Sequence, residues 1–262
     1  MSAESAIALA LALPLIAAVI TPLLGRWPNS REAMTLIVGG VLFVIVASLT
    51  PQVLAGGRPG LELFTLLPGL TLAFEIEPLG MLFALIASGL WIVTSCYSIG
   101  YMRSHNEKDQ TRYYAFFAVA ICGALGVAFA RNMITLFLFY ELLTLSTYPL
   151  VTHHRTEQAR RSGRIYLGVL LSTSIGLLLL GMVWTWHLTG TLEFTPGGIL
   201  AGKADPREIG VLLALFAFGT GKAALMPFHR WLPAAMVAPT PVSALLHAVA
   251  VVKADVFTVM KV

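Results

Sequence analysis

The sequence predicts an all-α fold: a polytopic bundle of about eight transmembrane helices that forms one membrane domain, residues 1–262. Of the 262 residues, 57% are hydrophobic and 11% are charged, whereas about a quarter of the residues in a soluble domain are charged. Apolar runs also recur, each near the ~20 residues that a helix needs to cross a hydrocarbon core of about 30 Å. We expect spans at 6–25, 33–51, 78–100, 113–130, 133–151, 165–187, 209–236 and 241–262.

The first run is predicted to be a membrane helix rather than a cleaved signal peptide, because it carries Glu4 and has no basic stretch or clear cleavage site. Lys and Arg concentrate on the cytoplasmic side of membrane proteins. We therefore expect an extracytoplasmic N terminus, which puts nine of these residues in inside loops and four in outside loops. The nine are Arg26, Arg31, Arg103, Lys108, Arg112, Arg155, Arg160, Arg161 and Arg164, and the four are Arg58, Arg131, Lys203 and Arg207.

Two longer connections lie between the predicted spans. Segment 52–77 is punctuated by Gly and Pro and holds three glutamates, so we expect an extracytoplasmic hairpin or a short amphipathic element there. Segment 188–208 has a similar residue pattern. Neither connection is long enough to form a separate domain.

Four charged residues fall inside the predicted spans: Glu141, Lys222, Lys253 and Asp255. A charge at the centre of a bilayer costs roughly 2.5–3.5 kcal/mol on insertion scales, so such residues usually face protein or water and carry function. Glu141 shares a helix face with Thr144 and Tyr148, which predicts a polar stripe that faces inward. Glu141 fits either a protonatable carboxylate or a neutral side chain that hydrogen-bonds two helices together.

Lys222 precedes Pro227 by five residues. Burial disfavours the charged form of a lysine, so a buried lysine can release its proton near neutrality. Pro227 would free the carbonyl of Ala223 and break the helix, and broken helices at membrane depth survive where they line protein or a wet cavity. The alternative is a lysine that snorkels to the membrane surface. A phosphate-binding loop is excluded, because Phe216 occupies its first Gly position and Ala223 replaces Ser or Thr.

The last predicted helix carries His247, Lys253 and Asp255. Histidine has the unperturbed pKa nearest neutrality, which suits a proton relay, although a lone histidine in a helix also packs as a hydrogen-bonded residue. Helical spacing separates the three side chains around the axis, so they do not form one tight cluster. His153 and His154 lie in a basic connection, where we expect a solvated loop without a metal.

The motifs of most enzyme classes are absent from the sequence. No serine nucleophile elbow, HExxH motif, dinucleotide fingerprint or paired-cysteine metal motif occurs, and nothing specific supports His187 and His247 as haem ligands. Cys96 and Cys122 lie in apolar runs, as buried thiols do. The net charge of +4 requires no nucleic acid partner. We expect no cofactor and no metal on this chain.

The stretch KAALMPFHRWLPAAMVAPTPVSALLHA, residues 222–248, resembles the proton-conducting antiporter-like subunits of respiratory complex I, membrane-bound hydrogenases and Mrp-type sodium/proton antiporters. YELLTLSTYPLV, residues 140–151, is similar to the fifth helix of that family, and the Mrp subunits designated D look closest. The resemblance runs from about residue 70 onward. It implies about fourteen helices in two inverted repeats with a discontinuous seventh helix, so we expect 1–111 to hold helices one to three and 112–262 to hold helices four to eight of the first repeat.

The resemblance also implies roles for single residues. Glu141 would modulate Lys222, and protons would pass through Lys222, His247 and Lys253 by way of water, with the helix break and relay supported by Pro227, Pro239 and Pro241. Asp255 stands where the family usually has a small residue, so it would either pair with a neighbouring cation or perturb the relay.

The family implies a transporter subunit without its own redox site, multi-pass in the inner (plasma) membrane and in a complex with other membrane subunits. Its cargo would be protons, together with Na+ where sodium is exchanged. The chain is expected to end near helix eight, as a fragment, a split subunit or a degenerate copy. A truncated or structural subunit without transport is the alternative function, and a quinone-binding oxidoreductase has no motif to support it.

Overall fold

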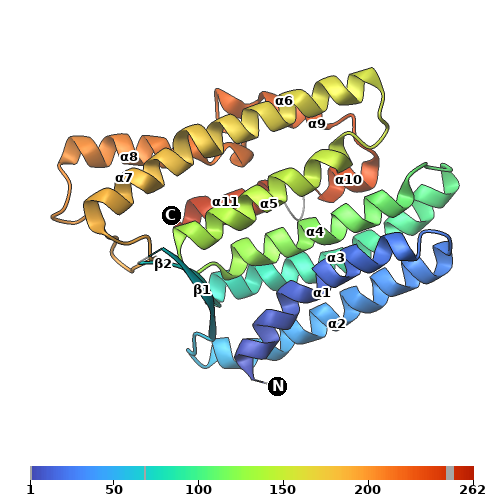
Figure 1. Ribbon diagram of the computed structural model, residues 1–262, viewed down its shortest axis with the longest axis horizontal. Coiled ribbons are helices and arrows are strands. Elements are labelled where there is room, and N and C mark those ends of the chain that lie inside the picture. The colour runs from blue at the N-terminus through green and yellow to red at the C-terminus, as the bar shows by residue number, and fades with distance from the viewer. Residues whose placement is uncertain (1, 68, 246–250) are drawn as a thin grey trace.

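The computed structural model describes residues 2–67, 69–245 and 251–262, so His247 lies outside the described residues. Helices dominate it, with one small β-hairpin (Figure 1). The helices of the first part are α1 (Ala3–Leu23), α2 (Pro28–Leu54), α3 (Pro78–Ser104), α4 (Gln110–Phe129) and α5 (Met133–Val151). Then follow α6 (Glu157–Thr173), the π-helical η1 (Ser174–Leu178), α7 (Leu179–Thr189), α8 (Pro206–Gly219), α9 (Trp231–Ala235), α10 (Thr240–Ala244) and α11 (Val251–Lys261).

Six continuous helical runs in the described residues are long and apolar enough to span a membrane: α1 to α5, and the run Glu157–Thr189 that joins α6, η1 and α7. They correspond to the first six predicted spans. The predicted span 209–236 is not one helix, because α8 has 14 residues and ends at Gly219. The predicted span 241–262 begins with the short helix α10 and ends with α11. The chain is thus an all-α polytopic membrane protein with a discontinuous seventh helix.

Local sequence explains where several helices begin. The Asn132 side chain accepts the N–H of Thr135 at 2.9 Å and starts α5, and Thr156 accepts the N–H of Ala159 at 3.1 Å and starts α6. These bonds satisfy backbone donors that a helix start leaves without partners.

The expected hairpin is present in segment 52–77, as β1 (Gly60–Leu67) and the antiparallel β2 (Leu70–Glu75). It closes one end of the bundle, where the carbonyl of Ala73 accepts the N–H of Arg131 at 3.0 Å and the N–H of Ala73 donates to Thr135 at 3.0 Å. Between α7 and α8, Glu193 forms an isolated bridge with Asn132, and the described residues there form no paired strand. The hairpin therefore ties the connection between α4 and α5 in place.

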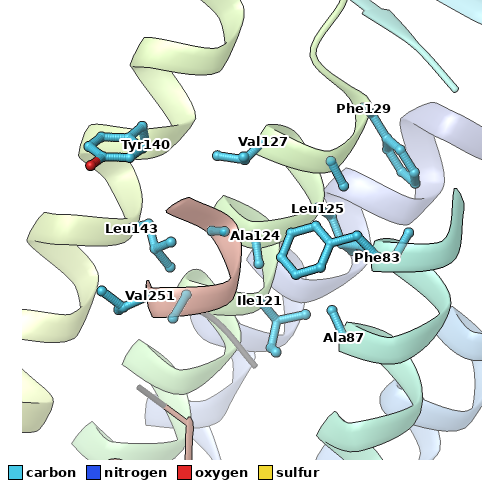
Figure 2. Packing of buried hydrophobic residues seen from close by; sticks show 14 of the residues in the cluster. Phe83, Ala87, Ile121, Ala124, Leu125, Val127, Phe129, Tyr140, Leu143 and Val251 are labelled. Carbon is cyan, nitrogen blue, oxygen red and sulfur yellow. The ribbon is translucent and has the colours of Figure 1, made fainter. Parts of the chain in front are cut away.

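Helix α4 runs through the middle of the bundle, between α1, α3 and α5 (Figure 1). A Cβ at Gly126 would overlap the ring of Phe139 on α5, and one at Gly123 would lie 3.2 Å from Leu143. Small residues let helices approach closely, which stabilises helix pairs in lipid. Figure 2 shows Leu143 of α5, Ala124 of α4 and Val251 of α11 in one apolar cluster. This packing brings α11 next to the middle of α5.

Candidate functional site

The helix break that carries Lys222 begins at Gly219, where α8 ends. Residues Gly221–Ala223 form a single 3-10 turn, η2, and Ala224 has a φ of +55°. A second 3-10 turn, η3 (Phe228–Arg230), follows the exposed Pro227. The sequence-based explanation was therefore wrong in detail: Pro227 does not interrupt a helix at Ala223, because the helix has already ended.

Two glycines flank the start of the break, and both pass closely against the helical run Glu157–Thr189. A Cβ at Gly219 would lie 2.5 Å from the backbone nitrogen of Leu178 in η1, and a Cβ at Gly221 would overlap the side chain of Thr173. The extra residue in the π-helical turn of η1 lies at this crossing, and such turns are frequent at functional sites. The close crossing positions the η2 turn inside the protein.

The indole of Trp231 holds the turn from its other side. Its N–H donates to the carbonyl of Gly221 at 2.9 Å. Trp231 is fully buried, and its ring meets that of Tyr166 edge to face, with 5.6 Å between the centroids. The Tyr166 hydroxyl hydrogen-bonds Thr147 at 2.6 Å. The Gly221 carbonyl, which also accepts the N–H of Ala224 at 3.2 Å, is thus fully bonded, as backbone at membrane depth requires.

Lys222 is fully buried. Its ammonium donates to the carbonyl of Tyr140 at 2.5 Å and lies over the Tyr140 ring, 2.9 Å from the centroid. Its backbone N–H lies 3.4 Å from the Tyr140 hydroxyl. Among the described residues, no carboxylate oxygen lies within 4.0 Å of the ammonium. Lys222 is therefore a buried cation that contacts Tyr140 rather than a counter-charge.

Glu141, the next residue along α5, is half-buried. Both of its carboxylate oxygens are buried, and neither has a hydrogen-bond partner in the described part of the chain. Its charge interacts electrostatically with Lys222. Of the predicted polar stripe, Thr144 is buried and donates to the carbonyl of Tyr140 at 3.2 Å, while Tyr148 is half-buried. Glu141 thus lies close to Lys222 without an ion pair.

Asp255 enters the site from α11 and is fully buried. Its carboxylate accepts the backbone N–H of Ala223 through Oδ2 and the hydroxyl of Tyr140. Its Oδ1 has no hydrogen-bond partner among the described residues. Asp255 also interacts electrostatically with Lys222. The cation near Asp255 is thus Lys222 of the same chain, with which it forms no ion pair within 4.0 Å.

The remaining sequence-selected residues lie elsewhere or support the site indirectly. Lys253 is exposed and lines a cavity of about 290 Å³ between α3 and α11. It is two positions from Asp255, which is about 200° around a helix, so the two side chains leave α11 in opposite directions. Pro239 precedes α10 and Pro241 lies in its first turn, and both are buried. The structure brings Glu141, Lys222 and Asp255 together and places Lys253 apart.

Tyr140 belongs to the site but was missed from the sequence. A neutral tyrosine in an apolar helix does not stand out by hydropathy. The one signal that could have identified it is its position beside Glu141. Within the described residues, no three His, Cys, Asp or Glu side chains come together in a way that would hold a metal ion.

Sequence comparisons match the chain to a family of transmembrane proteins. The family described as NADH:quinone oxidoreductase/Mrp antiporter, TM, matches residues 130–262. Subunit A1 of a Na(+)/H(+) antiporter from Staphylococcus aureus is 30% identical over 261 residues, which cover 97% of this chain and 32% of that protein. The same subunit from the strain JH9 of that species is equally similar. These relatives are designated A1, whereas the motifs looked closest to the Mrp subunits designated D.

Two solved structures share the fold. The membrane-bound sulfane sulfur reductase, an archaeal respiratory membrane complex, superposes with a TM-score of 0.82 at 25% identity, over 97% of this chain and 52% of that one. The Mrp complex from Dietzia sp. DQ12-45-1b gives a TM-score of 0.78 at 28% identity, over 96% of this chain and 27% of that one. The chain spans about a third of the length of the curated relatives it matches. Because the family's domain covers half of the sequence, including the broken helix, the chain belongs to the NADH:quinone oxidoreductase/Mrp antiporter transmembrane family.

Proposed function

We propose that the chain is a proton-translocating membrane subunit of a multisubunit cation/proton antiporter or of a complex I-like redox-driven pump. The observation that carries the proposal is Lys222, a fully buried ammonium on a broken helix with no ion-pair partner among the described residues. The relatives support it, because one is named as a subunit of a Na(+)/H(+) antiporter and another belongs to a respiratory membrane complex.

The chemistry follows from burial and from the position of Glu141. Burial disfavours the charged form of Lys222, whereas a nearby ionised carboxylate favours it. Lys222 therefore holds a proton while the ionised carboxylate of Glu141 is close, and releases it when the carboxylate is neutralised or the distance grows.

The later steps of the route are His247 and Lys253, reached through water. Lys253 opens into the cavity beside α3 and has no hydrogen-bond or ion-pair partner among the described residues, so it is free to pass a proton onward from this face. We assign 1–111 to the N-terminal helices and 112–262 to the proton-channel repeat, a division that lies at the start of α4. Other membrane subunits are the partners, Na+ is the candidate exchanged cation, and the N terminus is extracytoplasmic in the inner membrane.

The experiment is proton flux through the assembled complex in liposomes, followed with a pH-sensitive dye. Lys222→Ala should assemble and reduce flux to less than about a tenth of the wild-type rate, because the site has no other buried cation among the described residues. Lys203→Ala is the matched control, since Lys203 is exposed in the connection between α7 and α8 and should leave flux unchanged. An assembled Lys222→Ala complex with wild-type flux would overturn the proposal in favour of a structural subunit.

A further inference from the structure

We infer that Asp255 is a second acidic residue of the lysine site, which we define as Tyr140, Glu141 and Lys222. It holds the turn that carries Lys222 and adds a second negative charge near Lys222 besides that of Glu141. The inference rests on the proposed function of Lys222. It assigns a positioning role to a side chain that the sequence pattern set apart from the proton route.

The contacts of Asp255 frame Lys222 on two sides. Ala223, whose N–H donates to Asp255, is the residue that follows Lys222 in the η2 turn. Tyr140, whose hydroxyl donates to the same carboxylate, is also the residue whose carbonyl accepts the Lys222 ammonium. Asp255 therefore joins α11 both to the turn that carries the lysine and to the residue that the lysine contacts.

The charge of Asp255 requires a partner, because an ionised carboxylate buried away from water is unfavourable unless it is paired or hydrogen-bonded. Two donors contact it, and Oδ1 has none among the described residues. The titratable groups that face it are Lys222 on η2 and Tyr140 on α5. Helix α4, which also packs on α11, carries no charged residue beyond Arg112 in its first turn. The lysine is the one cation that the described surroundings of Asp255 provide.

Lys222 thus lies within the electrostatic influence of two carboxylates on different helices, Glu141 on α5 and Asp255 on α11. Both favour the protonated lysine, so neutralising either one should favour release of the proton. Asp255 differs from Glu141 in that hydrogen bonds fix it to the turn. The attraction between Asp255 and Lys222 therefore stays constant when the charge or the position of Glu141 changes.

The test is the pH dependence of proton flux through the assembled complex in liposomes. Asp255→Asn keeps the size of the side chain and an oxygen that can accept the Ala223 N–H, but removes the charge. We expect flux to persist with its half-maximal pH lower by about one unit, because the lysine loses its proton more readily without the carboxylate. Asp255→Glu should keep the wild-type profile, whereas Asp255→Leu, which removes charge and acceptor together, should lose most of the flux.

Thr258→Val is the matched control, since Thr258 is equally buried on α11 and its hydroxyl bonds, in the part of the chain that is described, only the carbonyl of Ala254 in its own helix. Its profile should equal that of the wild type. If Asp255→Asn does not assemble, Tyr140→Phe is measured instead: it deletes the hydroxyl that favours the ionised Asp255 and should shift the profile in the same direction, by less. An unshifted or oppositely shifted profile overturns the role of Asp255, while wild-type flux in Lys222→Ala overturns the proposed function itself.

Discussion

Two clusters of buried charges in the described part of the chain differ in how they are paired. The first joins the start of α2 to α3 and α4 and is built on Arg31 and Glu32, each 3% exposed. The second is the lysine site, in which Lys222 and Asp255 are fully buried. The extent of burial is therefore nearly the same, and the contrast lies in the contacts.

Every charge of the first cluster has an opposite charge or several donors and acceptors beside it. Glu32 accepts from Arg31 at 3.3 Å and from Nε of Arg103 at 3.2 Å. Arg31 also donates to Gln110 at 2.9 Å and Thr111 at 3.1 Å. In the lysine site, by contrast, Glu141 has no hydrogen-bond partner among the described residues. Paired charges fix helices in place, whereas a buried charge without a fixed partner keeps alternatives open.

Neutralising one glutamate in each cluster tests the difference in pairing with the largest expected effect on stability. Glu32→Gln leaves Arg31 buried without its counter-charge, and removing one partner of a buried pair destabilises by about 3–5 kcal/mol. Glu141→Gln removes a carboxylate that has no bonded partner, so the change in stability should stay within about 1 kcal/mol. The midpoint of thermal unfolding of the purified complex in detergent measures both.

A paired replacement controls for simple loss of packing. The double variant Arg31→Met with Glu32→Leu removes both charges and keeps apolar volume, so it should recover much of the loss seen with Glu32→Gln. Equal destabilisation by Glu32→Gln and Glu141→Gln would show that the two clusters do not differ in the way proposed.

A methyl group at the helix break should have the next largest effect. Gly219→Ala places a Cβ 2.5 Å from the Leu178 nitrogen, so α8 and η1 must move apart, at about 1–3 kcal/mol. Gly210→Ala is the matched control on the same helix, because nothing lies within 4 Å of its Cβ; it should gain up to about 1 kcal/mol. Thermal unfolding of the complex distinguishes the two, and equal midpoints would contradict the close crossing.

The sequence was sufficient for most of the membrane architecture because hydropathy acts over whole spans. It located six continuous helices and the hairpin within segment 52–77. It missed that Arg31 and Glu32 lie within the first turns of α2 and are buried, because charges beside Pro28 and Asn29 resemble a loop. The predicted solvated loop at His153 and His154 was also wrong for His153, which is 4% exposed.

The candidate site was predictable where a charge interrupted an apolar run, which is how Glu141 and Lys222 were found. Which helices face each other was not predictable, since periodicity describes one helix at a time. The position of Asp255 near Lys222 could therefore not be predicted. The position of the break was misassigned to Pro227, because the crossing that requires Gly219 involves residues distant in the sequence.

A third buried titratable group, His153, is paired less closely than the charges of the first cluster and more closely than Glu141. It lies in the connection between α5 and α6. His153 packs edge to face on Tyr113, with 6.2 Å between the ring centroids. Its Nε2 is 3.8 Å from Glu107, and neither ring nitrogen has a hydrogen-bond partner among the described residues. Burial, together with the nearby guanidinium of Arg112, lowers the pKa of His153 below its ordinary value, and Glu107 opposes this.

The lowered pKa predicts a small loss of stability in acid. Below the ordinary pKa of 6.5 the unfolded chain binds a proton at His153 more readily than the folded chain, so stability is complete above that pH and declines as pH falls through it. His153→Gln should reduce the drop in the unfolding midpoint between about pH 7.5 and pH 5.5, by less than the effect of Gly219→Ala. His154→Gln is the control, because His154 approaches the same Glu107 with a side chain that is 37% exposed. If wild type and His153→Gln lose the same stability in acid, His153 behaves as a paired charge, and the contrast between fixed and unpartnered buried groups does not extend to this connection.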